Sequence, residues 1–110
     1  MDSLVGINSK KFTERERSIL IFCLKRRIDN LKMENNNFFD NSKSWKEFNY
    51  YPVLNSRFKL EDNSNKLFTK AEKLSLLSCV NEELINNENE ELINEIIVEE
   101  LKIIRKKFKS

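Results

Sequence analysis

Two segments of the chain share one order of apolar and polar residues and predict the same kind of helix. Residues 12–30 and 68–86 both read Phe-Thr, then Glu, Leu, Cys and Asn at matching positions, with the second copy fifty-six positions after the first. Thr at the start with Glu three residues later is the signature of a capping box, which satisfies backbone N–H groups at a helix N-terminus. We therefore expect two capped amphipathic helices of similar construction, one in each half of the chain.

The hydrophobic pattern as a whole predicts an all-α fold, a small four-helix domain that spans all 110 residues and has an aromatic-rich central connection. Two of the predicted helices are long and two are shorter. Their ranges are about 14–34, 45–50, 70–86 and 88–108. The second helix is expected to end before Pro52. Two stretches, 18–24 and 53–60, are also compatible with a strand, and Val5 with Ile7 allows a brief strand near the N-terminus.

The last predicted helix combines a wide apolar stripe with separated charges. The stripe covers about half of the circumference, more than one neighbouring helix would bury. Its members are Leu92, Ile93, Ile96, Ile97, Leu101, Ile103, Ile104 and Phe108. Residues 81–100 hold eight Glu and no Lys or Arg, whereas residues 101–110 hold five Lys or Arg and no acidic residue. This order suits the helix macrodipole, and it would equally suit an antiparallel partner.

Seven of the eleven aromatic residues fall within residues 38–58, where turns are also expected. Most of these rings are expected in the core, but Tyr, Trp and Arg are also the residue types that dominate interface hot spots. We therefore expect an exposed subset of this segment, together with the apolar stripe of the last helix, to bind another protein. The candidate partner-binding residues are Trp45, Tyr50, Tyr51, Arg57, Ile96, Ile103 and Phe108.

Composition favours a helical protein without catalytic chemistry. A single Gly and a single Pro leave little turn chemistry for a β-sandwich, and 39% hydrophobic with 35% charged residues indicates a globular domain on the polar side. The chain has no His, which removes the usual general base and the commonest metal ligand. Its two Cys residues lie inside the apolar pattern of their helices and are too few for a zinc site. We expect no enzyme activity, no cofactor and no metal site.

Basic residues on the first predicted helix raise an alternative function. Lys25, Arg26 and Arg27 form a cluster that could contact phosphates, which would make the protein a nucleic-acid-binding transcriptional regulator. The acidic stretch at 81–100 and the net charge of only +2 weigh against a dedicated nucleic-acid binder. Residues 12–20 resemble the opening of the LuxR-type helix-turn-helix domain, in which Thr, Arg and Glu precede apolar residues. That family's turn and recognition helix have no counterpart, because the helical pattern simply continues.

The sequence thus predicts a small non-enzymatic regulator or inhibitor that binds another protein in the cytoplasm. Residues 1–11 lack the apolar run of a signal peptide, and no run approaches the roughly 20 residues that span a bilayer, so we expect no membrane association. The abundance of Asn, Lys, Ile and Glu is typical of AT-rich coding sequences. It suits many low-GC bacteria, their phages and some eukaryotic parasites. From the small size, the composition and the absence of catalytic groups, we expect a regulator or inhibitor that is encoded by a phage or other mobile element and acts on a host defence protein in the host cell cytoplasm. A homodimer formed through the last helix is the simplest partnership.

Overall fold

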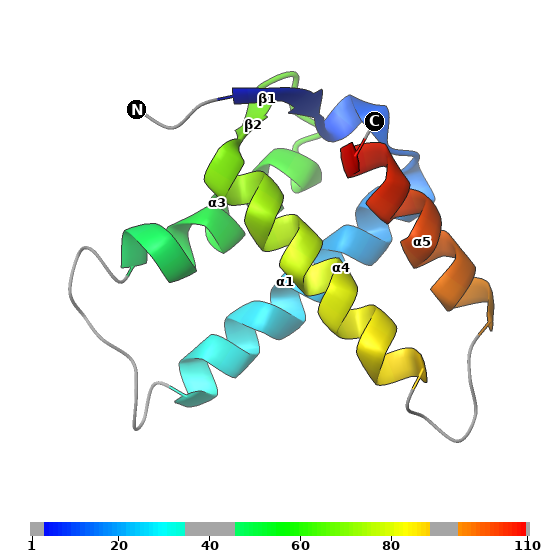
Figure 1. Ribbon diagram of the computed structural model, residues 1–110. Helices are drawn as coiled ribbons and strands as arrows, with labels where there is room; N and C mark the ends of the chain where they lie inside the picture. The colour runs from blue at the N-terminus through cyan, green and yellow to red at the C-terminus, as the bar shows by residue number, and fades with distance from the viewer. Residues whose placement is uncertain (1–3, 35–45, 89–94, 110) are drawn as a thin grey trace.

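The computed structural model describes residues 4–34, 46–88 and 95–109, and Figure 1 shows their arrangement. Within these ranges the protein consists of helices below one short two-stranded sheet. The elements in chain order are β1 (Leu4–Asn8), the 3-10 turn η1 (Ser9–Lys11), α1 (Glu14–Glu34), the π-helical turn η2 (Lys46–Tyr50), α3 (Tyr51–Glu61), β2 (Leu67–Thr69), α4 (Lys70–Glu88) and α5 (Glu95–Lys109). Apart from the small sheet and short connections, the described chain is helical, and the prediction of a small four-helix fold is confirmed.

The two halves of the chain are folded alike and cross each other. β1 pairs antiparallel with β2, with Leu4 opposite Thr69 and Asn8 opposite Leu67. Below this ribbon in Figure 1, α1 and α4 cross, and α3 and α5 lie on opposite sides of the crossing. α3 packs mainly on α1, and α5 packs mainly on α4. Each half is therefore a strand followed by two helices, and the two halves form a twofold-like arrangement within one chain.

The capping box predicted in the first half is present, and a lysine from the second half completes it. The Thr13 N–H donates to Glu16 Oε1 at 2.8 Å, and the Glu16 N–H donates to Thr13 Oγ1 at 3.1 Å. These two hydrogen bonds satisfy backbone donors that have no acceptor inside the helix. Lys107 of α5 then binds Glu16 Oε1 at 2.5 Å. The start of α1 is thereby fastened to the end of α5.

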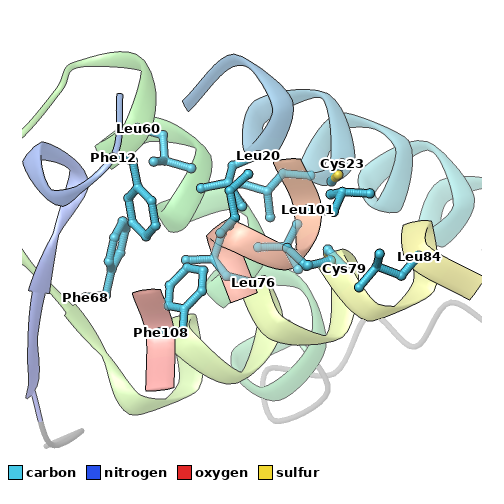
Figure 2. Packing of buried hydrophobic residues seen from close by; sticks show 14 of the residues in the cluster. Phe12, Leu20, Cys23, Leu60, Phe68, Leu76, Cys79, Leu84, Leu101 and Phe108 are labelled. Atoms are coloured by element: carbon cyan, nitrogen blue, oxygen red, sulfur yellow. The ribbon is translucent and has the colours of Figure 1, made fainter. Parts of the chain in front are cut away.

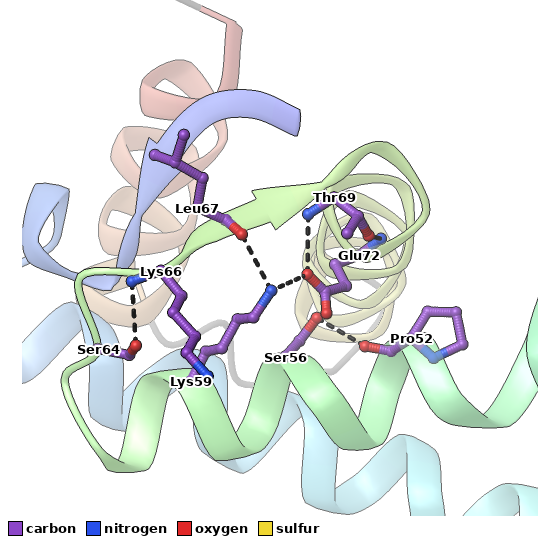
Figure 3. A network of polar contacts seen from close by, with 8 residues as sticks. All are labelled: Pro52, Ser56, Lys59, Ser64, Lys66, Leu67, Thr69 and Glu72. Atoms are coloured by element: carbon purple, nitrogen blue, oxygen red, sulfur yellow. Dashed lines mark hydrogen bonds and ion pairs between the residues drawn. The ribbon is translucent and has the colours of Figure 1, made fainter. Parts of the chain in front are cut away.

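The second half repeats this network, which Figure 3 shows from close by. Thr69 and Glu72 exchange the same two hydrogen bonds at 2.8 and 3.1 Å, and Lys59 of α3 binds Glu72 Oε1 at 2.6 Å. Lys59 also donates to the carbonyl oxygen of Leu67 at 3.0 Å. In both networks the lysine Nζ lies 5.9 Å from the ring centre of the phenylalanine that precedes the capping threonine. Because each lysine binds the glutamate of the other half, the two networks tie the halves together.

The hydrophobic core lies where the two halves meet (Figure 2). Phe12 and Phe68, which precede the two capping threonines, are both buried. Phe12 packs against Phe108 with the ring centroids 5.1 Å apart. The other buried apolar residues are Ile7, Leu20, Cys23, Leu24, Ile28, Val53, Leu60, Leu76, Cys79, Val80, Leu84, Val98, Leu101 and Ile104. Matching positions of the two halves therefore contribute to a single core.

The central connection differs from its prediction. α3 begins immediately after η2, so the helix predicted at 45–50 does not end before Pro52 but continues to Glu61. Pro52 is tolerated because it occupies the first turn of α3, where a backbone N–H has no intrahelical acceptor. Its carbonyl oxygen accepts a 2.7 Å hydrogen bond from the Ser56 hydroxyl. The open choice between helix and strand at 53–60 is thus resolved as helix.

The other predicted boundaries are close to the observed ones. α1 covers 14–34 as predicted, so residues 18–24 are helical and the turn of a LuxR-type domain does not occur there. α4 extends to Glu88, two residues beyond the prediction, and α5 begins at Glu95 rather than at residue 88. Residues 89–94 lie outside the described part of the chain. β1 confirms the brief N-terminal strand, whereas β2 formed in a region for which the sequence pattern predicted no strand.

Candidate functional site

A cleft of about 360 Å³ opens between α1, the end of α4 and the first turns of α5, and we call it the α1–α5 cleft. Phe22 lines the cleft and is 60% exposed. The apolar residues that line the cleft are Ile19, Phe22, Cys23, Ile97 and Leu101. The cleft is therefore an apolar depression on the surface of the described structure.

Two ion pairs frame the α1–α5 cleft. Arg15 Nε lies 3.0 Å from Glu100 Oε2, and Arg26 Nη1 lies 3.2 Å from Glu83 Oε1. Both arginines project from the same side of α1 as Phe22, because spacings of seven and four residues keep side chains on one helical stripe. An apolar floor surrounded by paired charges suits the binding of an apolar group.

A second cleft, of about 280 Å³, occupies the equivalent place on the other side of the helix crossing, between α1, η2, α3 and α4. Ser75 and Ser78 line it at the positions that correspond to Ile19 and Phe22 in the first cleft. Phe48 of η2 stands exposed at its edge. The two clefts therefore share a position in the fold but differ in polarity.

The basic cluster predicted on α1 is largely paired within the fold. Arg26 binds Glu83, and Arg27 Nη2 lies 2.5 Å from Glu82 Oε2. The two pairs are reciprocal, because two consecutive arginines of α1 face two consecutive glutamates at the equivalent positions of α4. Lys25 is exposed. Carboxylates thus already neutralise two of the three charges that a phosphate-binding surface would use.

The partner-binding candidates in the central connection lie away from the α1–α5 cleft. Trp45 is outside the described residues. Tyr50 and Tyr51 meet edge to face with their ring centroids 6.0 Å apart, and Tyr51 remains exposed. Arg57 is bound to Glu61 at 2.8 Å, one helical turn further along α3. Figure 1 places η2 and α3 on the side of the crossing opposite to α5, so these residues and the cleft form separate surfaces.

The candidates on α5 divide into two groups. Ile96 and Ile103 are 68% and 49% exposed, so both are presented to solvent. Phe108 is buried against Phe12 and is a core residue, which removes it from any surface that this fold offers to a partner. The reason is its register, because Phe108 shares the inward face of α5 with Leu101. The first two members of the predicted stripe, at positions 92 and 93, lie outside the described residues.

Sequence reasoning missed several exposed apolar side chains as site residues. They are Phe22, Phe48, Leu74 and Ile85. A signal for Phe22 was present, because the first helix is apolar over more than half of its girth near this residue and no single neighbour could cover it. The positions of Leu74 and Ile85 in the hydrophobic pattern of α4 indicate that they face away from the core. The pattern does not indicate that they share a surface.

Burial has the largest effect on the pKa of the two cysteine thiols that border the clefts. Burial raises the pKa of the Cys23 thiol to about 12, and the nearby Glu83 carboxylate adds to this increase. Burial also raises the pKa of the Cys79 thiol, to about 11, although the neighbouring Arg27 opposes the increase. A thiol with a pKa this high is protonated at neutral pH and is a poor nucleophile. These cysteines therefore serve as apolar packing residues.

Comparison of the chain with protein-family models, curated proteins and solved structures found no match. Across the described ranges, no three side chains of the types His, Cys, Asp and Glu come together as metal ligands. None of the described helices has the length and apolar character needed to cross a membrane.

Proposed function

We propose that the protein is a small non-enzymatic regulator or inhibitor that binds another protein through the α1–α5 cleft. The observation that carries this proposal is the exposed ring of Phe22 at the mouth of an apolar cleft. Removing an apolar side chain of this size from water is worth about 1.5–3 kcal/mol, which a partner would gain on covering it. Aromatic anchors of this kind dominate the binding free energy of many interfaces.

The surroundings of Phe22 support the same proposal. The cleft volume of about 360 Å³ is large enough to receive apolar side chains from a partner. Arg15 and Arg26 lie at its two ends, roughly 16 Å apart along α1 at the usual rise of an α-helix. An apolar centre with a polar rim is the common anatomy of protein interfaces. An inhibitor encoded by a phage or other mobile element could act on a host protein with such a surface alone, and this is the form of regulator that we propose.

The alternative of a nucleic-acid-binding regulator has less support. Its basic cluster consists of Lys25, Arg26 and Arg27, and both arginines are paired with glutamates of α4. Binding to phosphates would require the loss or sharing of these contacts, and the chain as a whole has a net charge of only +2. We therefore retain protein binding as the proposed function.

A photo-reactive phenylalanine analogue at position 22 tests the docking site. In an extract of the native host, we expect the analogue in place of Phe22 to cross-link to one specific protein. The matched control is the same analogue in place of Phe58, which is 52% exposed on α3. The purified partner should then bind the Phe22→Asp variant at least about ten times more weakly and the Phe58→Asp variant unchanged, because truncating a hot-spot ring commonly costs more than 1 kcal/mol.

Two results would contradict the cleft as the docking site. One is a partner that binds Phe22→Asp as tightly as the unchanged protein. The other is cross-linking from position 58 with none from position 22, which would move the contact to α3. Circular dichroism of both variants checks that their helices are intact, and we expect intact helices because both rings are exposed.

A further inference from the structure

We propose that the solvent-facing stripe of α5 binds the same stripe of a second copy of the chain, with the two helices antiparallel. The stripe consists of Ile96, Glu99, Ile103 and Lys106, all four exposed. Spacings of three and four residues place the four side chains on one face of the helix. This face is opposite to the inward residues of α5, so the stripe is separate from the α1–α5 cleft.

The exposed isoleucines give the stripe its apolar part. Ile96 and Ile103 are 68% and 49% exposed and are two helical turns apart. Ile97 and Leu101, which line the cleft, project from another side of the helix. Figure 1 shows α5 as an outer helix next to α4, with no described element covering its far side. Two β-branched side chains are thus left in water on one helical face, where a second helix could cover them.

The charged members of the stripe favour a second, antiparallel copy of α5 as the binding partner. Glu99 and Lys106 make no ion pair with any other residue in the described ranges. They are seven residues apart, about 10.5 Å along the helix axis. When two copies of α5 are antiparallel and centred between residues 102 and 103, Glu99 of each copy lies opposite Lys106 of the other. A parallel pair would place Glu99 against Glu99, so the charges favour the antiparallel arrangement.

The twofold symmetry of such a pair makes each contact occur twice. Two Glu99–Lys106 ion pairs would flank Ile103 of both copies near the axis. A contact limited to one face of a 15-residue helix is smaller than the roughly 1,200 Å² of a stable interface. We therefore expect a weak dimer that forms only at high protein concentration.

Sedimentation equilibrium over a range up to about 1 mM tests this inference, since weak association has a Kd of this order. The apparent mass of the unchanged protein should rise from 13.2 kDa towards twice this value. The Ile103→Glu variant should remain monomeric. Its matched control is Ile85→Glu on α4, because Ile85 is 58% exposed and lies outside the stripe, and this variant should associate like the unchanged protein.

Charge exchange distinguishes an antiparallel second copy from any other contact. Glu99→Lys alone and Lys106→Glu alone should each abolish association, because each variant brings like charges together twice. A 1:1 mixture of these two variants should associate again, because the mixed dimer has one Glu99–Lys106 pair as in the unchanged protein and one pair with its charges exchanged. An unchanged protein that stays at 13.2 kDa throughout, or a mixture that does not associate, would overturn the proposal. Neither result bears on the α1–α5 cleft, so the two proposals can fail separately.

Discussion

The two halves of the molecule use the same contacts to hold the fold but present different surfaces. Each half has a capping box whose glutamate binds a lysine of the other half, at 2.5 Å for Glu16 and Lys107 and at 2.6 Å for Glu72 and Lys59. Contacts that recur in both halves are those that the architecture itself needs. Positions that differ between the halves are not needed to hold this architecture, so residues with a function are expected among them.

The clefts on the two sides of the helix crossing show this difference. In the α1–α5 cleft the positions of Ile19 and Phe22 are apolar, whereas their equivalents in the second cleft are Ser75 and Ser78. A serine in place of an exposed phenylalanine presents less apolar surface to water and so lowers the tendency of a free monomer to associate. The exposed Phe22 in one half is therefore a departure from symmetry that supports binding of a partner at the α1–α5 cleft.

The largest expected effect comes from the rings that both halves bury. Phe12→Ala and Phe68→Ala should each lower the free energy of unfolding by about 3–5 kcal/mol, because each empties a buried site in the shared core. The control is Phe58→Ala, which removes an exposed ring and should have little effect. Urea denaturation followed by circular dichroism measures all three. A small loss for one of the two buried rings would show that the halves do not share the core equally.

The next effect concerns the pH dependence of the capping network at Glu16. Burial raises the pKa of Glu16, but the hydrogen bonds from Lys107 and Thr13 outweigh it, so the pKa lies below the ordinary value of 4.5. A carboxylate with a lowered pKa in the folded state stabilises the protein above its ordinary pKa, and this stabilisation disappears as the pH falls through the folded pKa. Glu16→Gln should therefore cost about 1.5–3 kcal/mol at neutral pH, as for other hydrogen bonds to charged groups.

Urea denaturation at a series of pH values from neutral into the acid range provides the measurement. The loss caused by Glu16→Gln should shrink as the pH falls through the folded-state pKa of Glu16, because the carboxyl of the unchanged protein then becomes protonated. Thr13→Ala serves as the control, because it removes a cap of about 1 kcal/mol without removing the charge. A Glu16→Gln loss that does not change with pH would show that the charge of Glu16, and with it the ion pair to Lys107, contributes nothing to stability.

The repeat itself could be read from the sequence, because helix caps are local signals. Thr and Glu three residues apart identify a capping box without knowledge of the fold, and both boxes occur where the sequence predicts them. The start of α3 could not be predicted in the same way. Pro52 is compatible with the end of one helix and with the first turn of the next, and only the packing of α3 on α1 decides between them.

The candidate site was predictable only in part, because exposure depends on which neighbour covers each side of a helix. The apolar stripe of α5 was evident, but its members divide between the core, with Phe108, and the surface, with Ile96 and Ile103. Periodicity gives the width of a stripe and not the part of it that a neighbour buries. The contacts of the lysines in the capping networks could not be predicted either, since Lys107 and Glu16 are ninety-one positions apart in the sequence.

The reciprocal ion pairs offer a finer comparison of the halves. Arg26→Glu should destabilise the protein more than Arg27→Glu, because Glu83 is the more buried of the two glutamates. We expect up to about 1 kcal/mol for Arg27→Glu, the upper range for partly exposed pairs. The exchange Arg27→Glu with Glu82→Arg should restore most of the loss, which a double-mutant cycle measures. An exchange that restores nothing would indicate that Arg27 acts through packing and not through its charge.

The smallest expected effect is a difference in reactivity between the two thiols, and it does not concern stability. Burial raises the pKa of both thiols, to about 12 for Cys23 and about 11 for Cys79; Glu83 adds to the increase at Cys23, whereas Arg27 opposes it at Cys79. The thiolate is the reactive form, so the thiol with the lower pKa should react faster at a given pH. Iodoacetamide should therefore label Cys79 in the Cys23→Ala variant faster than it labels Cys23 in the Cys79→Ala variant, with mass spectrometry as the readout.

Access could also produce a difference in labelling rate, so the charge of Arg27 needs a control of its own. Arg27→Gln keeps a polar side chain of similar reach but removes the positive charge beside Cys79. It should slow the labelling of Cys79 and leave the labelling of Cys23 almost unchanged, because the largest effects on Cys23 are burial and Glu83. Labelling of both thiols at one rate, with or without Arg27, would mean that reagent reaches them only through opening of the shared core. The thiols would then respond as one unit, and the electrostatic asymmetry between the halves would have no chemical consequence.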